Sequence, residues 1–250
     1  MVEGKVLIVG AGPGDPELLT VKADRCLRSA EVLVYDRLVH PDIVSLVPED
    51  CERIYAGKRK HLHAMTQANI NATLVAKARV GFDVVRLKGG DPFIFGRGGE
   101  EAQALRAAGI EFEIVPGITA GVGAAATAGV SLTHRDHAQA VTFVTAHRRH
   151  GQLEIDWDLV ARPAQAVVFY MAGSVAPELA QGLLTHGVAA SRYVTVVSHA
   201  TRANESRTTM TLAEFAHCGQ SLPSPAVIIL HDVEPLTAVA EMPIEYQQLA

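Results

Sequence analysis

The 250-residue chain contains few cysteines, few aromatic residues and no surplus of basic residues. Cys26, Cys51 and Cys218 lie far apart and form no Cys-x-x-Cys pair, which excludes a disulfide scaffold and a cysteine-based zinc site. Aromatic residues account for 5% of the chain, and 22 Lys and Arg against 27 Asp and Glu give a net charge of -5. Since nucleic-acid-binding proteins usually have a basic surplus and aromatic stacking platforms, we expect no nucleic-acid partner.

The sequence also lacks a long apolar run and a recognisable signal peptide. Its longest apolar stretches, such as residues 164–170, are far shorter than the ~20 residues that span a bilayer. Glu3 lies just before the first strand-like stretch and Lys5 begins it, which is unlike a signal peptide. We therefore expect a cytoplasmic protein with no membrane partner.

Short β-branched runs alternate with segments of helical spacing in the first half of the chain. Strands are predicted at residues 5–9, 32–35, 84–87 and 112–115, and helices at 15–30, 66–79 and 100–108. The second half has predicted strands at 141–145, 166–170, 193–198, 207–210 and 226–230, a helix at 177–186, and shorter helices near Trp157 and Leu212. The alternation predicts an α/β fold with a mostly parallel first sheet.

The composition changes after residue 117, where an Ala- and Gly-rich stretch begins. We therefore expect an N-terminal α/β domain at 1–117, a linker region at 118–137 and a C-terminal α/β domain at 138–250.

A glycine turn, Val-Gly-Ala-Gly-Pro-Gly-Asp-Pro at residues 9–16, follows the first predicted strand. Such a turn lets backbone N–H groups approach a nucleotide-type ligand. Asp36 closes the second strand, where a dinucleotide fold has its ribose-binding carboxylate, but Asp15 stands where the dinucleotide fingerprint has a third glycine. By itself the turn is compatible with a dinucleotide site, an adenosyl site or a purely structural tight turn.

A second glycine segment, Arg-Leu-Lys-Gly-Gly-Asp-Pro-Phe-Ile-Phe-Gly-Arg-Gly-Gly-Glu-Glu at residues 86–101, leaves a predicted parallel strand and enters a helix. Open α/β sheets bind their ligands at the carboxyl ends of their strands. A long, charged, glycine-rich loop at that position therefore indicates a functional site more than a solvated connector.

These two segments occur in order with five further motifs: VYDRL at 34–38, GKR at 57–59, VPGITA at 115–120, THRD at 133–136 and FYM at 169–171. Together the motifs resemble the tetrapyrrole (corrin and porphyrin) methyltransferase family, and within it the uroporphyrinogen-III C-methyltransferases. The resemblance covers about residues 4–236. It implies two α/β domains, with a mostly parallel sheet in the first, a mixed sheet in the second and the active site in the cleft between them.

The resemblance also implies an enzyme that uses S-adenosylmethionine (SAM) to methylate uroporphyrinogen III on two adjacent pyrrole rings. The products are precorrin-2 and S-adenosylhomocysteine, and the family is usually homodimeric. An alternative within the same fold is a later methyltransferase of the precorrin and corrin pathway. The sequence leaves open whether sirohaem, cobalamin or haem d1 biosynthesis uses the product.

Site residues follow from the matched motifs, position by position. The expected SAM contacts are Pro13, Gly89, Gly90, Asp91, Ile94, Thr119, Ala120, Met171 and Ala200. The resemblance gives Asp36 as proton acceptor, Lys58 as proton donor, Arg97 as a further catalytic candidate, and Arg97, Glu100 and Arg135 as substrate-handling residues.

The chemistry of these side chains agrees with such roles. A carboxylate such as Asp36 is suited to accept a proton. The guanidinium of Arg97 stays protonated and is better suited to bind a substrate carboxylate than to act as a base. A polycarboxylate substrate requires a locally basic cleft despite the net charge of -5. The 11 histidines show no metal-ligand spacing, so we expect no metal. His231 departs from the family pattern near the expected C-terminal wall of the SAM pocket.

Overall fold

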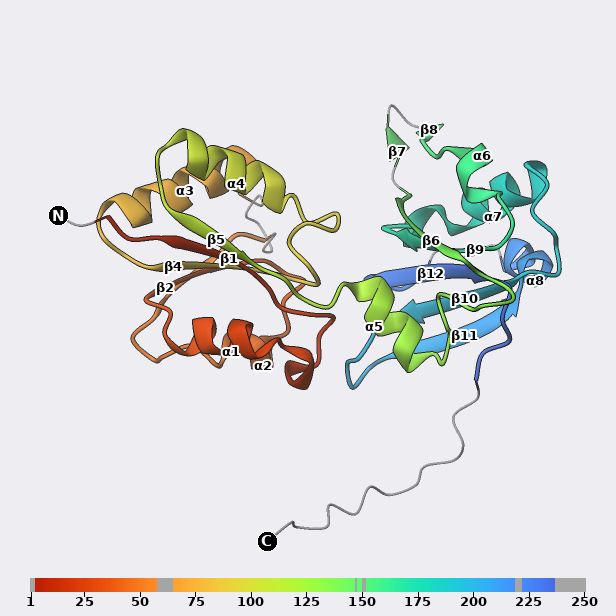
Figure 1. Cartoon of the computed structure of the whole chain (residues 1–250), viewed down its shortest axis with the longest axis horizontal. Helices are drawn as coiled ribbons and strands as arrows, with labels where there is room; N and C mark the ends of the chain where they lie inside the picture. Colours follow the sequence, from red (N-terminus) through yellow and green to blue (C-terminus); the bar gives the residue numbers. More distant parts are fainter. Residues whose placement is uncertain (1–2, 58–64, 147, 150–151, 219–221, 237–250) are drawn as a thin grey trace, which may run out of the picture.

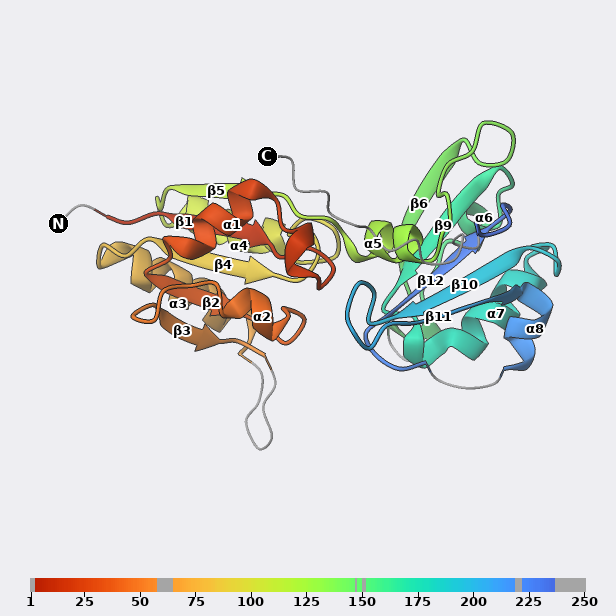
Figure 2. The same cartoon turned by 90° about the horizontal axis from the view of Figure 1, so that it is seen from below.

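The computed structural model describes residues 3–57, 65–146, 148–149, 152–218 and 222–236. It contains two five-stranded sheets, each covered by helices on both faces (Figures 1 and 2). We refer to each sheet with its helices as the first and second lobe. The short hairpin of β7 (Arg148–Arg149) and β8 (Gln152–Leu153) lies apart from both sheets.

The first sheet is parallel throughout, in the order β3-β2-β4-β1-β5. Its strands are β1 (Val6–Gly10), β2 (Val32–Tyr35), β3 (Glu52–Tyr55), β4 (Val84–Lys88) and β5 (Phe112–Val115). The central strands β1, β2 and β4 are almost wholly buried. Burial on both faces explains their continuous apolar runs, and the prediction of a mostly parallel sheet is confirmed.

Helices α1 (Val21–Arg28) and α2 (Pro41–Val44) cover one face of this sheet, and α3 (Gln67–Arg79) and α4 (Gly98–Ala107) cover the other (Figure 1). Leu27 of α1 packs in one core cluster with Leu33, and Leu74 of α3 packs in another with Val34. Alternate residues of β2 therefore reach opposite cores, as the pleat of a strand requires.

The helix predicted at 15–30 is two separate elements. Asp15 accepts a hydrogen bond from the Glu17 N–H at 2.9 Å and caps a 3-10 turn, η1 (Pro16–Leu18). Thr20 then accepts one from the Ala23 N–H at 3.1 Å and caps α1. Because both capping residues have extended backbone, the chain starts a helix twice.

The second sheet is mixed, in the order β11-β10-β12-β9-β6. Its strands are β6 (Ala140–Thr145), β9 (Gln165–Tyr170), β10 (Tyr193–Ser198), β11 (Ser206–Thr211) and β12 (Ala226–His231). Only the β6–β9 pair is parallel. The predicted mixed sheet is thus confirmed.

Helix α5 (Ala120–Thr127) covers one face of the second sheet. The other face is covered by α6 (Trp157–Val160), the 3-10 turn η2 (Gly173–Val175), α7 (Ala176–Thr185) and α8 (Leu212–His217). The core on that side includes Phe169 and Leu179, both fully buried.

The chain passes from the first lobe to the second through α5 (Figure 1). A Cβ atom at Gly121 would lie 2.6 Å from the hydroxyl of Tyr170, and one at Gly123 would lie 2.8 Å from Cβ of Pro13. Small residues therefore allow α5 to pack closely against both the second sheet and the glycine turn. This helix lies inside the stretch that the sequence indicated only as a linker.

Candidate functional site

A cavity of about 790 Å³ lies between the two lobes. The first lobe lines it with residues that follow β1, β2 and β4, including Gly12, Asp36 and Gly89. The second lobe contributes residues such as Tyr170 and Ala226. The carboxyl ends of the parallel strands thus face the cavity, as expected for an α/β fold.

The glycine turn packs backbone against backbone at this edge of the sheet. Gly12 and Gly90 exchange two backbone hydrogen bonds, of 3.2 and 2.7 Å. A Cβ atom at Gly10 would lie 2.6 Å from the Gly117 nitrogen, and one at Gly117 would lie 2.4 Å from the Gly90 oxygen. These glycines bring the ends of β1, β4 and β5 together. Close packing of backbone therefore explains much of the glycine content of the turn.

Eight of the nine predicted SAM contacts line the cavity. Four belong to the first lobe, Pro13, Gly89, Gly90 and Ile94, and four to α5 and the second lobe, Thr119, Ala120, Met171 and Ala200. The ninth, Asp91, is not in the lining. Its carboxylate accepts hydrogen bonds from the N–H groups of Phe93, at 2.8 Å, and Gly117, at 3.1 Å, and so fixes the loop.

Asp36, the predicted proton acceptor, lines the cavity with its side chain 27% exposed. Its Oδ1 accepts a hydrogen bond from the Leu38 N–H at 3.0 Å, and its Oδ2 lies 3.4 Å from Nη2 of Arg86. Two contacts therefore orient the carboxylate.

A buried charge cluster that the sequence reading missed lies behind Asp36. Glu101 is fully buried, and its Oε1 accepts hydrogen bonds from Arg86 Nε at 3.0 Å, Lys88 Nζ at 2.9 Å and Gln67 Nε2 at 3.2 Å. Burial, together with the nearby charge of Arg86, lowers the pKa of Lys88. The sequence did contain a signal for this cluster. Two cations, Arg86 and Lys88, lie in the buried strand β4, and glutamates lie in the first turn of the next helix, α4.

Arg97 lines the cavity and forms two hydrogen bonds of 2.8 Å to Glu100. These bonds raise the pKa of Arg97 and lower that of Glu100, so both groups stay charged. Glu100 and Arg135 do not line the cavity, and Arg135 is exposed on the loop after α5. Lys58 lies outside the described residues.

The described lining of the cavity is basic. It contains one carboxylate, Asp36, and five cations, Arg37, Arg86, Lys88, Arg97 and Arg202. The expected local surplus of positive charge is therefore present in a chain whose net charge is -5.

Left-handed backbone concentrates around the cavity. Phe95, Arg97, Met171 and His199 all line it, and their φ angles lie between 51° and 60°. Non-glycine residues rarely adopt this conformation, and such strain is commonly retained at functional sites.

His231 lies at the opposite end of β12 from the cavity-lining residues Ala226 and Val227. Its Nδ1 donates a hydrogen bond to the Val233 carbonyl at 2.7 Å, and its Nε2 lies 2.8 Å from Oγ1 of Thr195. The departure at His231 therefore affects the core of the second lobe and not the cavity wall.

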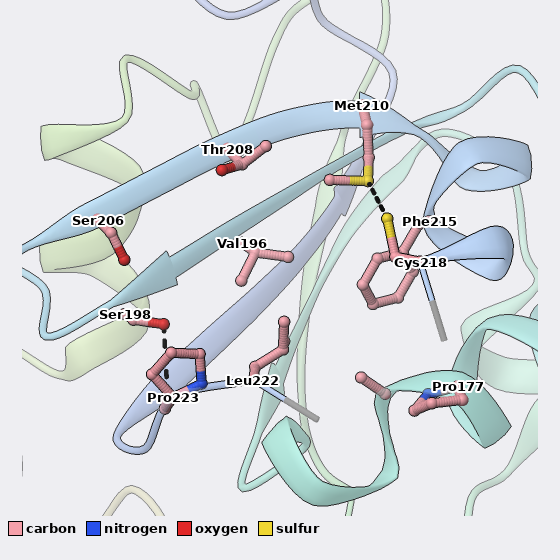
Figure 3. A pocket seen from close by; sticks show the side chains of 11 residues that line it. Pro177, Val196, Ser198, Ser206, Thr208, Met210, Phe215, Cys218, Leu222 and Pro223 are labelled. Atoms are coloured by element: carbon pink, nitrogen blue, oxygen red, sulfur yellow. Dashed lines mark hydrogen bonds between the residues drawn. The ribbon is translucent and has the colours of Figure 1, made fainter. Parts of the chain in front are cut away.

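A smaller cavity of about 330 Å³ lies in the second lobe, between β10, β11 and the ends of α7 and α8 (Figure 3). The described residues that line it are apolar or uncharged, and they include none of the predicted site residues. Within it the Cys218 thiol lies 3.6 Å from the Met210 sulfur. Without charged groups, it is poorly suited to a carboxylate-rich ligand.

Among the described residues, no group of three or more His, Cys, Asp or Glu side chains is placed to hold a metal ion. No helix in the same part of the chain has the length and apolar character needed to cross a bilayer.

Comparison with known proteins identifies the family. Residues 5–216 match the family described as Tetrapyrrole (Corrin/Porphyrin) Methylases. The chain belongs to this family. A solved structure of uroporphyrin-III C-methyl transferase from Thermus thermophilus, complexed with S-adenyl homocysteine, is 36% identical with a TM-score of 0.82. The alignment covers 95% of this chain and all of that one (100%).

Other tetrapyrrole methylases have the same fold. A cobalt precorrin-4 methyltransferase is 28% identical with a TM-score of 0.80, over 90% of this chain and 94% of its own. A siroheme synthase from Chromobacterium violaceum is 50% identical over 232 residues, which are 92% of this chain and 49% of that protein. The chain thus spans about half the length of the curated relatives that it matches.

Proposed function

We propose that this methylase transfers methyl groups from SAM to two adjacent pyrrole rings of uroporphyrinogen III, giving precorrin-2 and S-adenosylhomocysteine. One observation carries the proposal: a basic cavity between the lobes is lined by eight of the nine residues expected to contact SAM. The likeness to the Thermus thermophilus enzyme supports the same substrate and cofactor.

The residues present fit a nucleoside-sized ligand such as SAM. Gly90 has a φ of +68°, and the cavity lining includes the small side chains of Ala120 and Ala200. Thr119 and Ala120 place the start of α5 at the wall of the cavity. When bound, SAM supplies an electrophilic methyl group together with its own leaving group.

The protein's part in the reaction is to position, to exclude water and to move a proton. The cavity walls would hold a nucleophilic ring carbon of the substrate against bound SAM. Methyl transfer would form a carbon–carbon bond, break the methyl–sulfur bond of SAM and leave a positive charge on the pyrrole ring, which loss of a neighbouring proton neutralises. Asp36, held by Leu38 and Arg86, accepts that proton. We assign Arg97 to a substrate carboxylate, and retain Lys58 as proton donor and Glu100 and Arg135 as further substrate-handling residues.

The remaining assignments belong to the same proposal. We assign residues 1–117 and 138–250 to two domains linked by 118–137, and we propose a cytoplasmic homodimer that uses no metal. An alternative is a later methyltransferase of the corrin pathway, since the cobalt precorrin-4 methyltransferase has the same fold.

The test is a mass measurement on the product. Purified protein with SAM and anaerobic uroporphyrinogen III should yield a tetrapyrrole that has gained two methyl groups, and Asp36→Asn should slow that gain. Calorimetry with S-adenosylhomocysteine shows whether the same preparation binds the cofactor product. Protein that binds it but leaves uroporphyrinogen III unchanged contradicts the proposal, and methylation of a precorrin instead supports the alternative. Binding of NAD alone would contradict the SAM site.

A further inference from the structure

We propose that Arg37 and Arg202, on opposite lobes of the large cavity, form an anion subsite that binds one carboxylate of the tetrapyrrole substrate. The inference rests on the proposed function for the identity of the substrate. Neither residue was among the site residues expected from the sequence.

The fold brings the two arginines to the same place. Arg37 follows β2, Arg202 lies in the loop between β10 and β11, and both line the cavity. Nη2 of Arg202 donates a hydrogen bond of 2.6 Å to the carbonyl of Leu38, the residue next to Arg37. A Cβ atom at Gly14 would lie 2.7 Å from Cγ and Nε of Arg202. The third glycine of the turn therefore leaves room for this side chain to cross between the lobes.

The charges of these two arginines are uncompensated in the described part of the chain. Arg86 and Lys88 pair with Glu101, and Arg97 pairs with Glu100. Arg37 and Arg202 form no ion pair with any described carboxylate, and Nε of Arg202 is buried without a hydrogen-bond partner there. Burial, and then the neighbouring charge of Arg37, lower the pKa of Arg202. A partly desolvated cation beside a like charge is unfavourable, and a bound anion would relieve it.

The guanidinium groups indicate the chemistry of that anion. Planar guanidinium forks match a carboxylate, which can accept two parallel hydrogen bonds. SAM has one carboxylate and uroporphyrinogen III has several. We assign the subsite to the substrate because Asp36, the proposed proton acceptor, immediately precedes Arg37 and accepts a hydrogen bond from Leu38. A carboxylate bound there would hold the reacting ring beside Asp36.

The test uses uroporphyrin III, the oxidised and fluorescent analogue, so that binding is read without methyl transfer. Titrations compare the unaltered protein with Arg37→Ala, Arg202→Ala and the double variant. Arg106→Ala, an exposed arginine of α4 outside the cavity, removes the same charge and serves as the control. We expect each single variant to weaken porphyrin binding about tenfold. The affinity of the double variant for porphyrin should fall by less than the product of the two single-variant factors, because the two arginines share one carboxylate.

Calorimetry with S-adenosylhomocysteine distinguishes the two sources of a carboxylate. We expect its affinity to stay within about twofold in every variant. Loss of S-adenosylhomocysteine affinity with unchanged porphyrin binding would overturn the inference and assign the arginines to the methionine carboxylate. Porphyrin binding unchanged in both single variants, or weakened equally in Arg106→Ala, would overturn it as well.

Two further outcomes separate this inference from its assumptions. Arg202→Ala also removes the hydrogen bond to Leu38 and could unfold the protein. In that case Arg37→Ala, which removes no described hydrogen bond, is the variant that tests the subsite. Protein whose porphyrin binding depends on both arginines, yet which does not methylate uroporphyrinogen III, contradicts the proposed function and supports the subsite. Protein that is active and whose variants bind porphyrin normally contradicts the subsite alone.

Discussion

The hydroxyl of Tyr170 on β9 accepts a hydrogen bond of 2.9 Å from the backbone N–H of Gly121, in the first turn of α5. It also lies 2.8 Å from Oγ1 of Thr119, the N-cap residue, whose own hydroxyl does not cap the helix. A tyrosine from the neighbouring sheet therefore provides a hydrogen-bond acceptor for a backbone N–H in the first turn of α5, where the helix itself offers none. Because Thr119 and Ala120 line the large cavity, this contact couples the second sheet to the proposed SAM site.

We expect Tyr170→Phe to lower the free energy of unfolding by about 1–2 kcal/mol, because the buried Gly121 N–H loses its acceptor. The affinity for S-adenosylhomocysteine should fall as well, since the start of α5 loses its anchor. Urea unfolding and calorimetry measure the two effects. Tyr193→Phe is the control, because the Tyr193 hydroxyl makes no hydrogen bond within the described ranges. Equal stability of the two variants would show that the cap is unimportant.

Neighbouring glutamates at the start of α4 should differ sharply in their effect on stability. Glu101→Ala leaves the buried Lys88 without its carboxylate and leaves Arg86 with Asp36 alone, and it should cost about 3–5 kcal/mol. Glu100 is exposed, and Glu100→Ala should change the free energy of unfolding by about 0.5 kcal/mol or less. Urea denaturation of both variants at one pH is the measurement. Similar losses would mean that the buried cluster carries little of the stability.

Arg97 and Arg135 should differ in their effect on turnover. Arg97 lines the cavity, whereas Arg135 is exposed outside its described lining. Arg97→Ala should raise the KM for uroporphyrinogen III about tenfold, with a smaller increase for Arg135→Ala. The affinity for S-adenosylhomocysteine should be retained in both. A larger increase in KM for Arg135→Ala than for Arg97→Ala would contradict this order and indicate that the loop after α5 contacts the substrate.

His231 should make the folded state sensitive to mild acid. Burial lowers its pKa below the ordinary value of 6.5, so the unfolded chain binds more protons at this position than the folded chain. The free energy of unfolding should therefore decline as the pH falls below about 6.5. His231→Gln, which cannot titrate, should have a flatter acid limb in urea unfolding between pH 7.5 and 5. Parallel curves for the two proteins would contradict this role.

The three cysteines should react unequally with a thiol reagent. Burial raises the pKa of Cys26 and of Cys51, which keeps both thiols protonated, while Cys218 is exposed. One thiol should react quickly in the native protein and the other two only on unfolding. Cys218→Ser should abolish the fast phase, and a fast phase that persists in this variant would contradict the burial of the other two.

Local sequence determined most of the sheet strands. β2, β5 and β10 match their predicted bounds because each is marked by a short run rich in β-branched, aromatic and other apolar residues. The run is continuous in the buried strand β2, and it is interrupted by Glu113 in the edge strand β5 and by Thr195 in β10. β3 (Glu52–Tyr55) was missed, since an edge strand with Glu52 and Arg53 exposed has no such run. α5 was missed because its Ala and Gly residues are buried on more than one side, which leaves no amphipathic period.

The same distinction applies to the site. Matched motifs identified the residues that line the cavity next to glycine-rich backbone. They did not identify the pairing of Glu101 with Arg86 and Lys88, which depends on the course of α4 over the sheet. The approach of Arg202 to Leu38 joins residues 164 positions apart, and nothing in the local sequence specifies it.

The packing of Gly10, Gly90 and Gly117 restricts how this protein can change over evolution. A side chain added at Gly10 or Gly117 would meet main-chain atoms within 3 Å. A neighbouring side chain can be replaced by a smaller one, but main-chain atoms cannot. Compensating substitutions nearby should therefore not restore the stability of Gly10→Ala or Gly117→Ala. Selection for a new substrate would have to act on side chains that line the cavity, such as Leu38, Ile94 and Met171. In a library that randomises Gly10 and Gly117 together with the cavity lining, we expect these two positions to remain glycine while the lining side chains diversify.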